Sequence, residues 1–153
     1  MSKRTIRDET GQEWAVEIDV QPSDDMLIPT LANFYVFHPA DMSKRSRYPI
    51  GHVYISIHNE DKTTAKIEDL EVNPELENRG IGSSLLELIE EWVRNHGIRK
   101  LIGDLSNVDG DHLDKLRHIY KKHGYIFALS SAGEKNSSVF IGKIEKVIDN
   151  PVN

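Results

Sequence analysis

Residues 65–97 read AKIEDLEVNPELENRGIGSSLLELIEEWVRNHG, and this stretch decides the fold. Its first part, residues 65–72, predicts a strand. From Ile81 to Val93 apolar residues recur at helical spacing, and Gly97 suits the end of that helix. Residues 98–105 read as a second strand. Because a helix that connects two strands of one sheet leaves them parallel, the stretch predicts a parallel strand pair.

Further strands are predicted on both sides of this unit, which gives an α/β (α+β) fold class. Upstream, alternating or β-branched residues indicate strands over 13–20, 31–37 and 51–57, with residues 5–7 as a hairpin partner. Downstream, the sequence predicts a helix over 113–123 that ends at Gly124, then strands over 125–129 and 138–143. Residues 22–29 are too interrupted for a long helix, and the polar residues 40–49 read as a loop.

Length and composition limit the functions to consider. A chain of 153 residues supports one domain over 1–153. The net charge of −6 disfavours nucleic acid and anionic membranes as partners and favours a cationic one. With no Cys there is no disulfide, thiolate nucleophile or Cys-ligated zinc. No apolar run is long enough to cross a bilayer and no export signal is visible, so we expect a cytoplasmic protein.

The loop between the first strand and the helix predicts an anion site. Gly80 and Gly82 remove side chains where the chain enters the helix, so a ligand can approach the backbone closely. The first helical turn carries unpaired N–H groups and partial positive charge, and Arg79 adds a full charge. The loop lacks the third Gly of a dinucleotide site and the Lys of a P-loop. A tight turn without a ligand is the alternative.

Two separate motifs together resemble the GNAT N-acetyltransferases. IEDLEVNP at 67–74 and NRGIGSSLL at 78–86 are similar to the acyl-CoA loop of that superfamily, and IYKKHGY at 119–125 is similar to its Tyr-containing helix end. The resemblance covers residues of about 64 to 127. It implies a mixed, mostly antiparallel sheet with flanking helices, in which the central parallel strands splay apart at one end and admit the pantetheine arm of acetyl-CoA.

The resemblance also implies a set of cofactor-binding residues. The pyrophosphate would rest on the backbone of Arg79, Gly80, Ile81, Gly82, Ser83 and Ser84, and the pantetheine amides would pair with Leu70, Glu71 and Val72. Three features depart from the family pattern. Glu77 stands where Gln or Arg is common, and we expect it to point to solvent. Asn107 is separated from Tyr120 by an acidic loop, and the N-terminal part reads mostly as strand where the family has helices.

The chemistry expected of such a site is direct attack of a neutral amine on the thioester, because no Cys can hold an acyl intermediate. Tyr120 resembles the general acid of the family, and an unperturbed phenol is protonated at neutral pH. The alternative for Tyr120 is packing in the apolar helix stripe. Glu68 shares a strand face with Leu70 and Val72 and resembles a glutamate of some polyamine acetyltransferases, which suggests a general base. A solvated carboxylate is equally expected there, and Glu71 or a water chain can serve instead.

Other polar clusters receive structural interpretations. The seven His residues lack metal-ligand spacing, so surface or packing roles are expected for His52, His123 and the rest, and no metal is predicted. Asp109-Gly110-Asp111 lacks the ligand pattern of a calcium loop. Lys44-Arg45-Ser46-Arg47 can touch a phosphate or an acidic substrate, but loop charge is the simpler interpretation.

The leading hypothesis is an acetyl-CoA-dependent N-acetyltransferase acting in a ternary complex on a small amine, a polyamine or a peptide amino group. A noncatalytic acyl-CoA-binding module is the alternative, and an interaction domain whose loop binds nothing is the third. The identity of the acceptor and the formation of a homodimer stay open.

Overall fold

The computed structural model describes residues 2–21, 29–57, 62–106, 112–129 and 140–148. Within these ranges the chain forms eight strands, two α-helices and two short 3₁₀ turns. In chain order they are β1 (Ser2–Arg7), β2 (Glu13–Gln21), β3 (Leu31–Phe37), η1 (Pro39–Asp41), β4 (Gly51–Ile57), β5 (Thr64–Val72), η2 (Pro74–Leu76), α1 (Ile81–Asn95), β6 (Lys100–Ser106), α2 (His112–Lys122), β7 (Ile126–Leu129) and β8 (Phe140–Val147).

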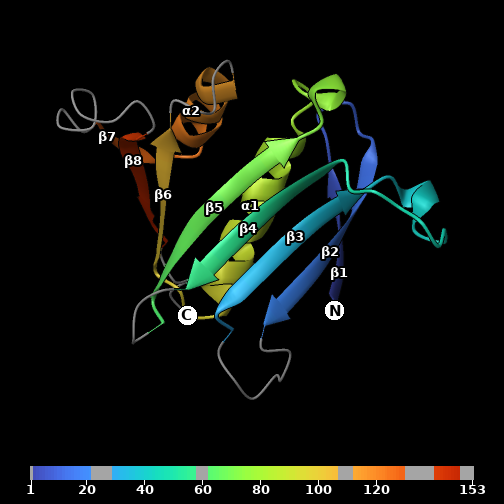
Figure 1. The fold of residues 1–153 in the computed structure, drawn as a ribbon, viewed down its shortest axis with the longest axis horizontal. Helices are drawn as coiled ribbons and strands as arrows, with labels where there is room; N and C mark the ends of the chain where they lie inside the picture. Colours follow the sequence, from blue (N-terminus) through green and yellow to red (C-terminus); the bar gives the residue numbers. More distant parts are fainter. Residues whose placement is uncertain (1, 22–28, 58–61, 107–111, 130–139, 149–153) are drawn as a thin grey trace.

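All eight strands belong to one sheet, in the order β1-β2-β3-β4-β5-β6-β8-β7 (Figure 1). Neighbouring strands are antiparallel except for β5 and β6, which are parallel. This arrangement confirms the predicted fold class and the predicted parallel pair. The hairpin before residue 20 is also confirmed, and its first strand is longer than expected because it pairs from Ser2 onward.

The parallel pair is joined over only part of its length. Pairing runs from Thr64 opposite Lys100 to Ile67 opposite Gly103. Beyond that point β5 continues to Val72 and β6 to Ser106 without pairing to each other. Figure 1 shows the two strands diverging toward the end of the molecule where α2 lies. The splay implied by the resemblance is therefore present.

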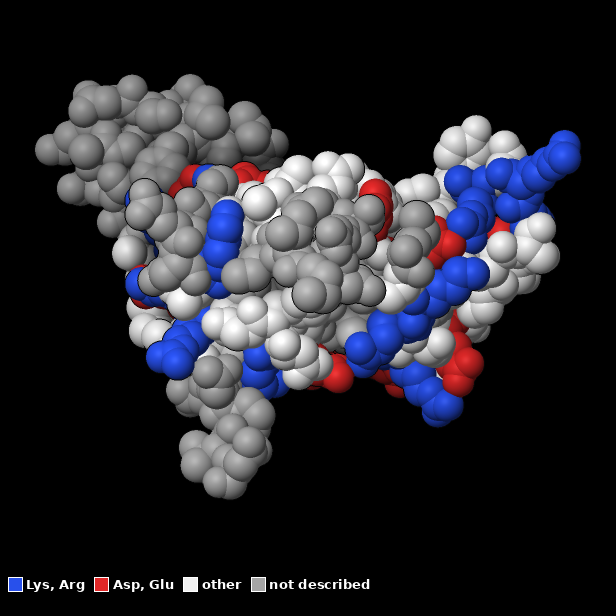
Figure 2. All heavy atoms as spheres, turned by 90° about the horizontal axis from the view of Figure 1, so that it is seen from below, with Lys and Arg blue, Asp and Glu red and all other residues white. Residues whose placement is uncertain are grey.

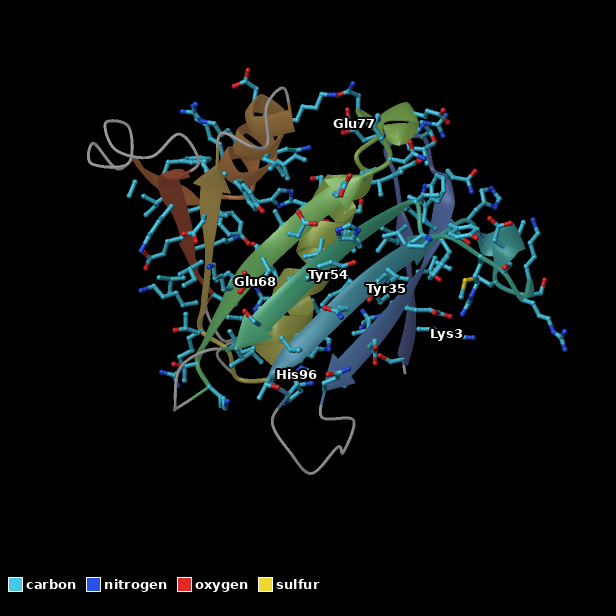
Figure 3. All side chains as sticks on the ribbon, viewed as in Figure 1. Lys3, Tyr35, Tyr54, Glu68, Glu77 and His96 are labelled. Atoms are coloured by element: carbon cyan, nitrogen blue, oxygen red, sulfur yellow. The ribbon has the colours of Figure 1, made fainter. Side chains whose placement is uncertain are left out.

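One face of the sheet is apolar and packs against α1. Alternate residues of β3 and β4, such as Phe34 and Val53, are fully buried, because side chains of a strand alternate between its two faces. Trp92 of α1 lies edge-on to Phe34 with ring centroids 5.7 Å apart, which identifies the face that the helix covers. On the opposite face Tyr35 and Tyr54 are only half-buried (Figure 3).

The described residues before β4 contain strands and one 3₁₀ turn, which confirms the mostly β N-terminal part. The prediction for residues 22–29 falls almost wholly outside the described residues. The last strand differs from its prediction: it continues to Val147, whereas the sequence indicated an end at Lys143, and residues 138 and 139 lie outside the described part. Lys146 and Val147 extend the pairing with β6, a long-range partner that strand periodicity does not reveal.

Basic side chains are unevenly distributed over the surface. Figure 2 views the end of the molecule opposite the η2–α1 loop and shows Lys and Arg gathered on the side of β1 and η1. Lys3 on β1 and Lys44 and Arg45 after η1 are exposed there. Among the described residues, no helix has the length and apolarity that a membrane span requires.

Candidate functional site

The start of α1 has the backbone of an anion site. Gly80 precedes the helix with φ +85°, a left-handed conformation that glycine adopts without strain. A Cβ at Gly80 would lie 2.6 Å from Cγ of Glu9, so a larger residue would also require the side chain of Glu9 to move. No described side chain caps this helix end, and the first N–H with a helical acceptor is that of Ser84, bonded to Gly80 O. The preceding N–H groups remain available to an acceptor.

A cavity of about 460 Å³ opens at this helix start. Its walls come from β5, the loop after η2, the first turn of α1, the exposed turn after β1 and the length of α2. The lining residues are Glu9, Leu70, Val72, Leu76, Glu77, Asn78, Gly80, Ile81, Gly82, Ser83, Asp114, Lys115, Leu116, His118, Ile119 and Lys122. Six of the predicted cofactor-binding residues belong to this lining: Leu70, Val72, Gly80, Ile81, Gly82 and Ser83.

The other three predicted cofactor residues do not line the cavity. The carbonyl of Arg79 accepts a 2.7 Å hydrogen bond from the N–H of Glu9, and the hydroxyl of Ser84 donates to the carbonyl of Arg7 at 2.5 Å. Both bonds attach the β1–β2 turn to the loop. The side chain of Glu71 is 61% exposed and lies 3.9 Å from His52 on the other face of the sheet.

Helix α2 packs directly against the first turn of α1. A Cβ added at Gly82 would lie 3.2 Å from Cδ1 of Ile119, so the two helices meet closely at this glycine. The hydroxyl of Ser83 is 2.5 Å from Nε2 of His123. The sequence indicated only a surface or packing role for His123, because its partner lies 40 residues away. This contact fixes the end of α2 beside the helix start.

The expectation that Glu77 points to solvent is wrong. Its side chain is 15% exposed, lines the cavity and forms an ion pair with Lys115 of α2. A second cation from α2, Lys122, lies 4.0 Å from Glu9. The local sequence did not reveal these pairs because α2 is brought over the loop by the fold.

Tyr120 is buried next to Ile119, a residue of α2 that lines the cavity. It is 4% exposed, and its ring centroid is 5.1 Å from that of Tyr125. Leu116 and Ile119, on the same helix, line the cavity, whereas Tyr120 is not one of the lining residues. Both the packing role and the general-acid role proposed for this residue therefore stay predictions.

Glu68 lies at a β-bulge, and the regular alternation expected for its strand is wrong at this point. The β4–β5 register passes from Ile55–Ile67 to Tyr54–Asp69, so Glu68 has no opposite residue. Glu68 is consequently exposed, while Leu70 and Val72 are buried. The hydroxyl of Ser56 donates to Oε1 of Glu68 at 2.5 Å, which holds the carboxylate over the face of the sheet opposite α1.

A cation bridges the two splayed strands beside Glu68. Nζ of Lys66 lies 3.0 Å from Oδ2 of Asp104 on β6 and 3.8 Å from Oε2 of Glu68. The bridge stands next to the last β5–β6 pair, where the strands begin to diverge. The hydrogen bond to Asp104 and the charge of Glu68 hold the pKa of Lys66 above its ordinary value despite partial burial, so Lys66 is a cation at neutral pH.

Aromatic and acidic side chains continue across this face (Figure 3). Tyr54 stacks on His52 with centroids 4.3 Å apart and lies edge-on to Tyr35 at 6.0 Å. Burial, followed by the nearby Tyr35 and Asp69, raises the pKa of Tyr54. Nε2 of His52 is 2.6 Å from Oδ2 of Asp69.

In the described part of the chain, His52, Asp69 and Glu71 are the one group whose three ligand-type atoms lie within 4.8 Å of one another. Such a group can hold a divalent cation. A hydrogen bond from the imidazole to Asp69 also accounts for the arrangement.

The basic cluster after η1 is engaged in local contacts. Arg47 pairs with Glu17 at 2.6 Å and lies over the ring of Phe37, and Lys44 pairs with Asp41 at 2.7 Å. Figure 1 shows η1 on the side of the sheet away from α2. The structural interpretation of this cluster is therefore favoured. Asn107 and Asp109-Gly110-Asp111 lie outside the described residues.

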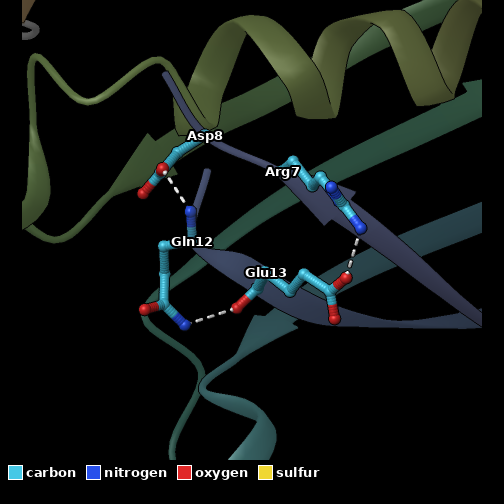
Figure 4. A network of polar contacts seen from close by, with 4 residues as sticks. All are labelled: Arg7, Asp8, Gln12 and Glu13. Atoms are coloured by element: carbon cyan, nitrogen blue, oxygen red, sulfur yellow. Dashed lines mark hydrogen bonds and ion pairs between the residues drawn. The ribbon is translucent and has the colours of Figure 1, made fainter. Parts of the chain in front are cut away.

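The turn between β1 and β2 borders the cavity and is organised by Asp8. This carboxylate accepts hydrogen bonds from the backbone N–H groups of Thr10 and Gln12 and from the indole N–H of Trp14, at 2.9 to 3.0 Å. A further bond from the Thr10 hydroxyl is the largest cause of a lowered pKa of Asp8. Figure 4 shows the exposed Arg7–Glu13 ion pair on the same hairpin.

Comparison with known proteins agrees with this geometry. The fold resembles the GNAT domain of S. lividans PAT (TM-score 0.66, 13% identity, 95% of this chain and 96% of that one). It also resembles PaiA N-acetyltransferase from Thermoplasma acidophilum in complex with coenzyme A (TM-score 0.58, 19% identity, 77% and 61%).

The sequence match to a known relative covers a shorter part of the chain. A stretch of 48 residues is 38% identical to the uncharacterized protein YocC of Bacillus subtilis (strain 168), covering 31% of this chain and 29% of YocC. The match thus spans less than a third of that relative. The sequence model of the Acetyltransferase (GNAT) family matches residues 5–125, most of the chain. The splayed strands, the cavity at the helix start and this match have one explanation: the chain belongs to the GNAT family of acetyltransferases.

Proposed function

We propose that the protein transfers an acetyl group from acetyl-CoA to a primary amine, by direct attack in a ternary complex. The observation that carries this proposal is the cavity at the uncapped start of α1, between β5 and α2. Helix N–H groups and the partial positive charge at a helix start favour a pyrophosphate. The absence of Cys from the sequence favours direct attack over an acyl-enzyme.

In this proposal the cofactor lies along the cavity, and six of its nine proposed binding residues line it. The pyrophosphate rests on the backbone of residues 79–84, with Gly80 and Gly82 giving close approach. The pantetheine arm follows residues 70–72 of β5. Leu70 and Val72 support this assignment because both line the cavity, whereas the exposed side chain of Glu71 would take no part beyond its backbone.

The acceptor amine approaches from the face of the sheet opposite α1. Glu68, as general base, takes a proton from the ammonium, directly or through water, and the neutral amine attacks the carbonyl carbon. The C–N bond forms, the C–S bond breaks, and Tyr120 donates its hydroxyl proton to the departing thiolate. The attacking nitrogen then loses its second proton, which water returns to the Tyr120 phenolate. The hydrogen bond from Ser56 and the nearby Lys66 support the role of Glu68, since they orient the carboxylate and favour its ionised form.

One observation favours a second candidate, an acyl-CoA-binding module without turnover. Tyr120 is buried and does not line the cavity, so the thiolate would need another proton donor if Tyr120 kept this position. Such a module would bind acyl-CoA as tightly as an enzyme but release no thiol.

Two measurements test the proposal. Calorimetry with acetyl-CoA is expected to show binding below high micromolar ligand, and absence of binding would contradict both candidates. A panel of primary amines, assayed for free thiol and for the acetylated product by mass spectrometry, is expected to contain at least one acceptor. Binding without turnover on polyamines, small amines and peptides alike would favour the binding module.

A further inference from the structure

The wall of the cavity carries more negative than positive side chains. Glu9, Glu77 and Asp114 line it, together with Lys115 and Lys122. Acyl-CoA carries a pyrophosphate and a further phosphate group. Such a ligand is repelled for as long as carboxylates occupy the wall and neutralise its two lysines. The strength of the ion pairs that these lysines form therefore affects the affinity of the cavity for such a ligand.

The two ion pairs differ in burial. Lys115, whose side chain is 44% exposed, pairs with Glu77, whose side chain is 15% exposed. Lys122 lies 4.0 Å from Glu9, and these side chains are 54% and 65% exposed. Water and salt screen an exposed pair, which then contributes little. Glu77 thus holds its cation more firmly than Glu9 does.

Glu77 also stands beside the groups that an anion would seek. It directly follows η2 and lies three residues before Gly80, close to η2 in Figure 3. The uncapped N–H groups at the start of α1 are the other positive groups of this wall. A carboxylate at position 77 offsets their attraction for phosphate, because the two anions compete for the same donors and repel each other.

We propose that the Glu77–Lys115 ion pair is an autoinhibitory contact of the cofactor cavity. Lys115 exchanges the carboxylate of Glu77 for a phosphate oxygen of acyl-CoA, so Lys115 is a phosphate-binding residue and Glu77 competes with the ligand for it. This inference rests on the proposed function, because it assigns roles at the same cavity. The exchange keeps Lys115 paired with an anion, and separating it from Glu77 lowers the affinity for the phosphorylated ligand.

The first test compares CoA with pantetheine, which has the same thiol arm and no phosphate. By calorimetry, Glu77→Gln is expected to bind CoA about 3–10-fold more tightly than the natural protein, and Lys115→Met about 5–10-fold more weakly. Neither change should alter pantetheine binding. Glu91→Gln removes the carboxylate of an exposed pair with Arg4, outside the residues that line the cavity, and is the control, with an expected change in CoA affinity below about 2-fold.

The outcomes separate this inference from the proposed function. If the natural protein binds no CoA, both fail. If it binds CoA and Glu77→Gln binds it equally or more weakly, the autoinhibitory contact is refuted while the proposed function stands. Melting temperatures show whether each variant is folded, and Lys115→Arg, which keeps the charge, replaces Lys115→Met if that variant unfolds. A complex with CoA in which Nζ of Lys115 still contacts Glu77 would also overturn the inference.

Discussion

The cavity at the start of α1 and the open face of the sheet are built in different ways. The wall that β5, the following loop and the start of α1 form comes from one short stretch, residues 70–83. The proposed chemistry of this wall depends on backbone N–H groups. The open face brings Tyr35, Tyr54 and Glu68 together from three strands, and its chemistry depends on side chains. A site made from one contiguous stretch can be predicted from a sequence motif, whereas a site made from side chains of several strands depends on the strand register.

The largest effect on CoA binding is expected from a substitution that places a side chain at the start of α1. Gly82→Asp puts a carboxylate against the pyrophosphate position and against Ile119, and we expect CoA binding to fall by more than about 100-fold. Gly82→Ala is the matched control. Its Cβ meets the flexible end of Ile119 at 3.2 Å and Cγ2 of Val72 at 3.9 Å, an ordinary contact, so calorimetry should show a loss of at most about 10-fold. Tight CoA binding by folded Gly82→Asp would remove the pyrophosphate from this loop.

Tyr120→Phe tests whether the two regions meet in one reaction. Loss of a general acid is expected to lower kcat about 10²–10⁴-fold while calorimetry shows unchanged CoA affinity. Tyr125→Phe is a control in the neighbouring ring, because burial raises the pKa of the Tyr125 hydroxyl and keeps it protonated. Equal turnover by Tyr120→Phe and the natural protein would remove Tyr120 from the mechanism.

The sequence predicted the parts that follow from local pattern. Periodicity was sufficient for the parallel pair, and the glycines at 80 and 82 were sufficient for the helix start. Glu68 was placed on the wrong face because a bulge depends on the partner strand. Glu77 was expected in solvent because its partner, Lys115, lies 38 residues away on another helix. Ion pairs between residues far apart in the sequence leave no local sequence pattern. The charge arrangement of both regions could therefore be described only from the structure.

The open face can be tested through pH. Lys66→Met removes the ammonium 3.8 Å from Glu68, and a nearby cation favours the ionised form of a carboxylate. In a plot of kcat/KM against pH, the acidic limb is therefore expected to move to higher pH by about 0.5–1 unit, with little change in kcat/KM above neutral pH. Lys100→Met, which loses only an exposed pair with Glu145, should leave the profile in place. An unmoved limb for Lys66→Met would argue against Glu68 as the base.

The smallest effect on activity is expected at the edge of the cavity, where Asp8 organises the turn that carries Glu9. Asp8→Asn loses acceptor capacity for the donors around this carboxylate, and the melting temperature at pH 7 should fall on the order of 5 °C. Because the folded-state pKa of Asp8 is lowered from 3.8, the stabilisation is present above that pH and is lost as the pH falls through the folded-state value. The difference between variant and natural protein should accordingly shrink in acid.

Glu13→Gln on the same hairpin separates this effect from general surface charge. It removes the Arg7–Glu13 pair, whose side chains are 70% and 51% exposed, and we expect a nearly unchanged melting temperature because exposed pairs contribute little. If Asp8→Asn melts like the natural protein at pH 7, the turn does not depend on this carboxylate. If Asp8→Asn has a lower melting temperature but an unchanged affinity for CoA, the loop at Arg79 and Gly80 keeps its shape without the support of the hairpin. The backbone site then depends less on the hairpin than its contacts with Glu9 indicate.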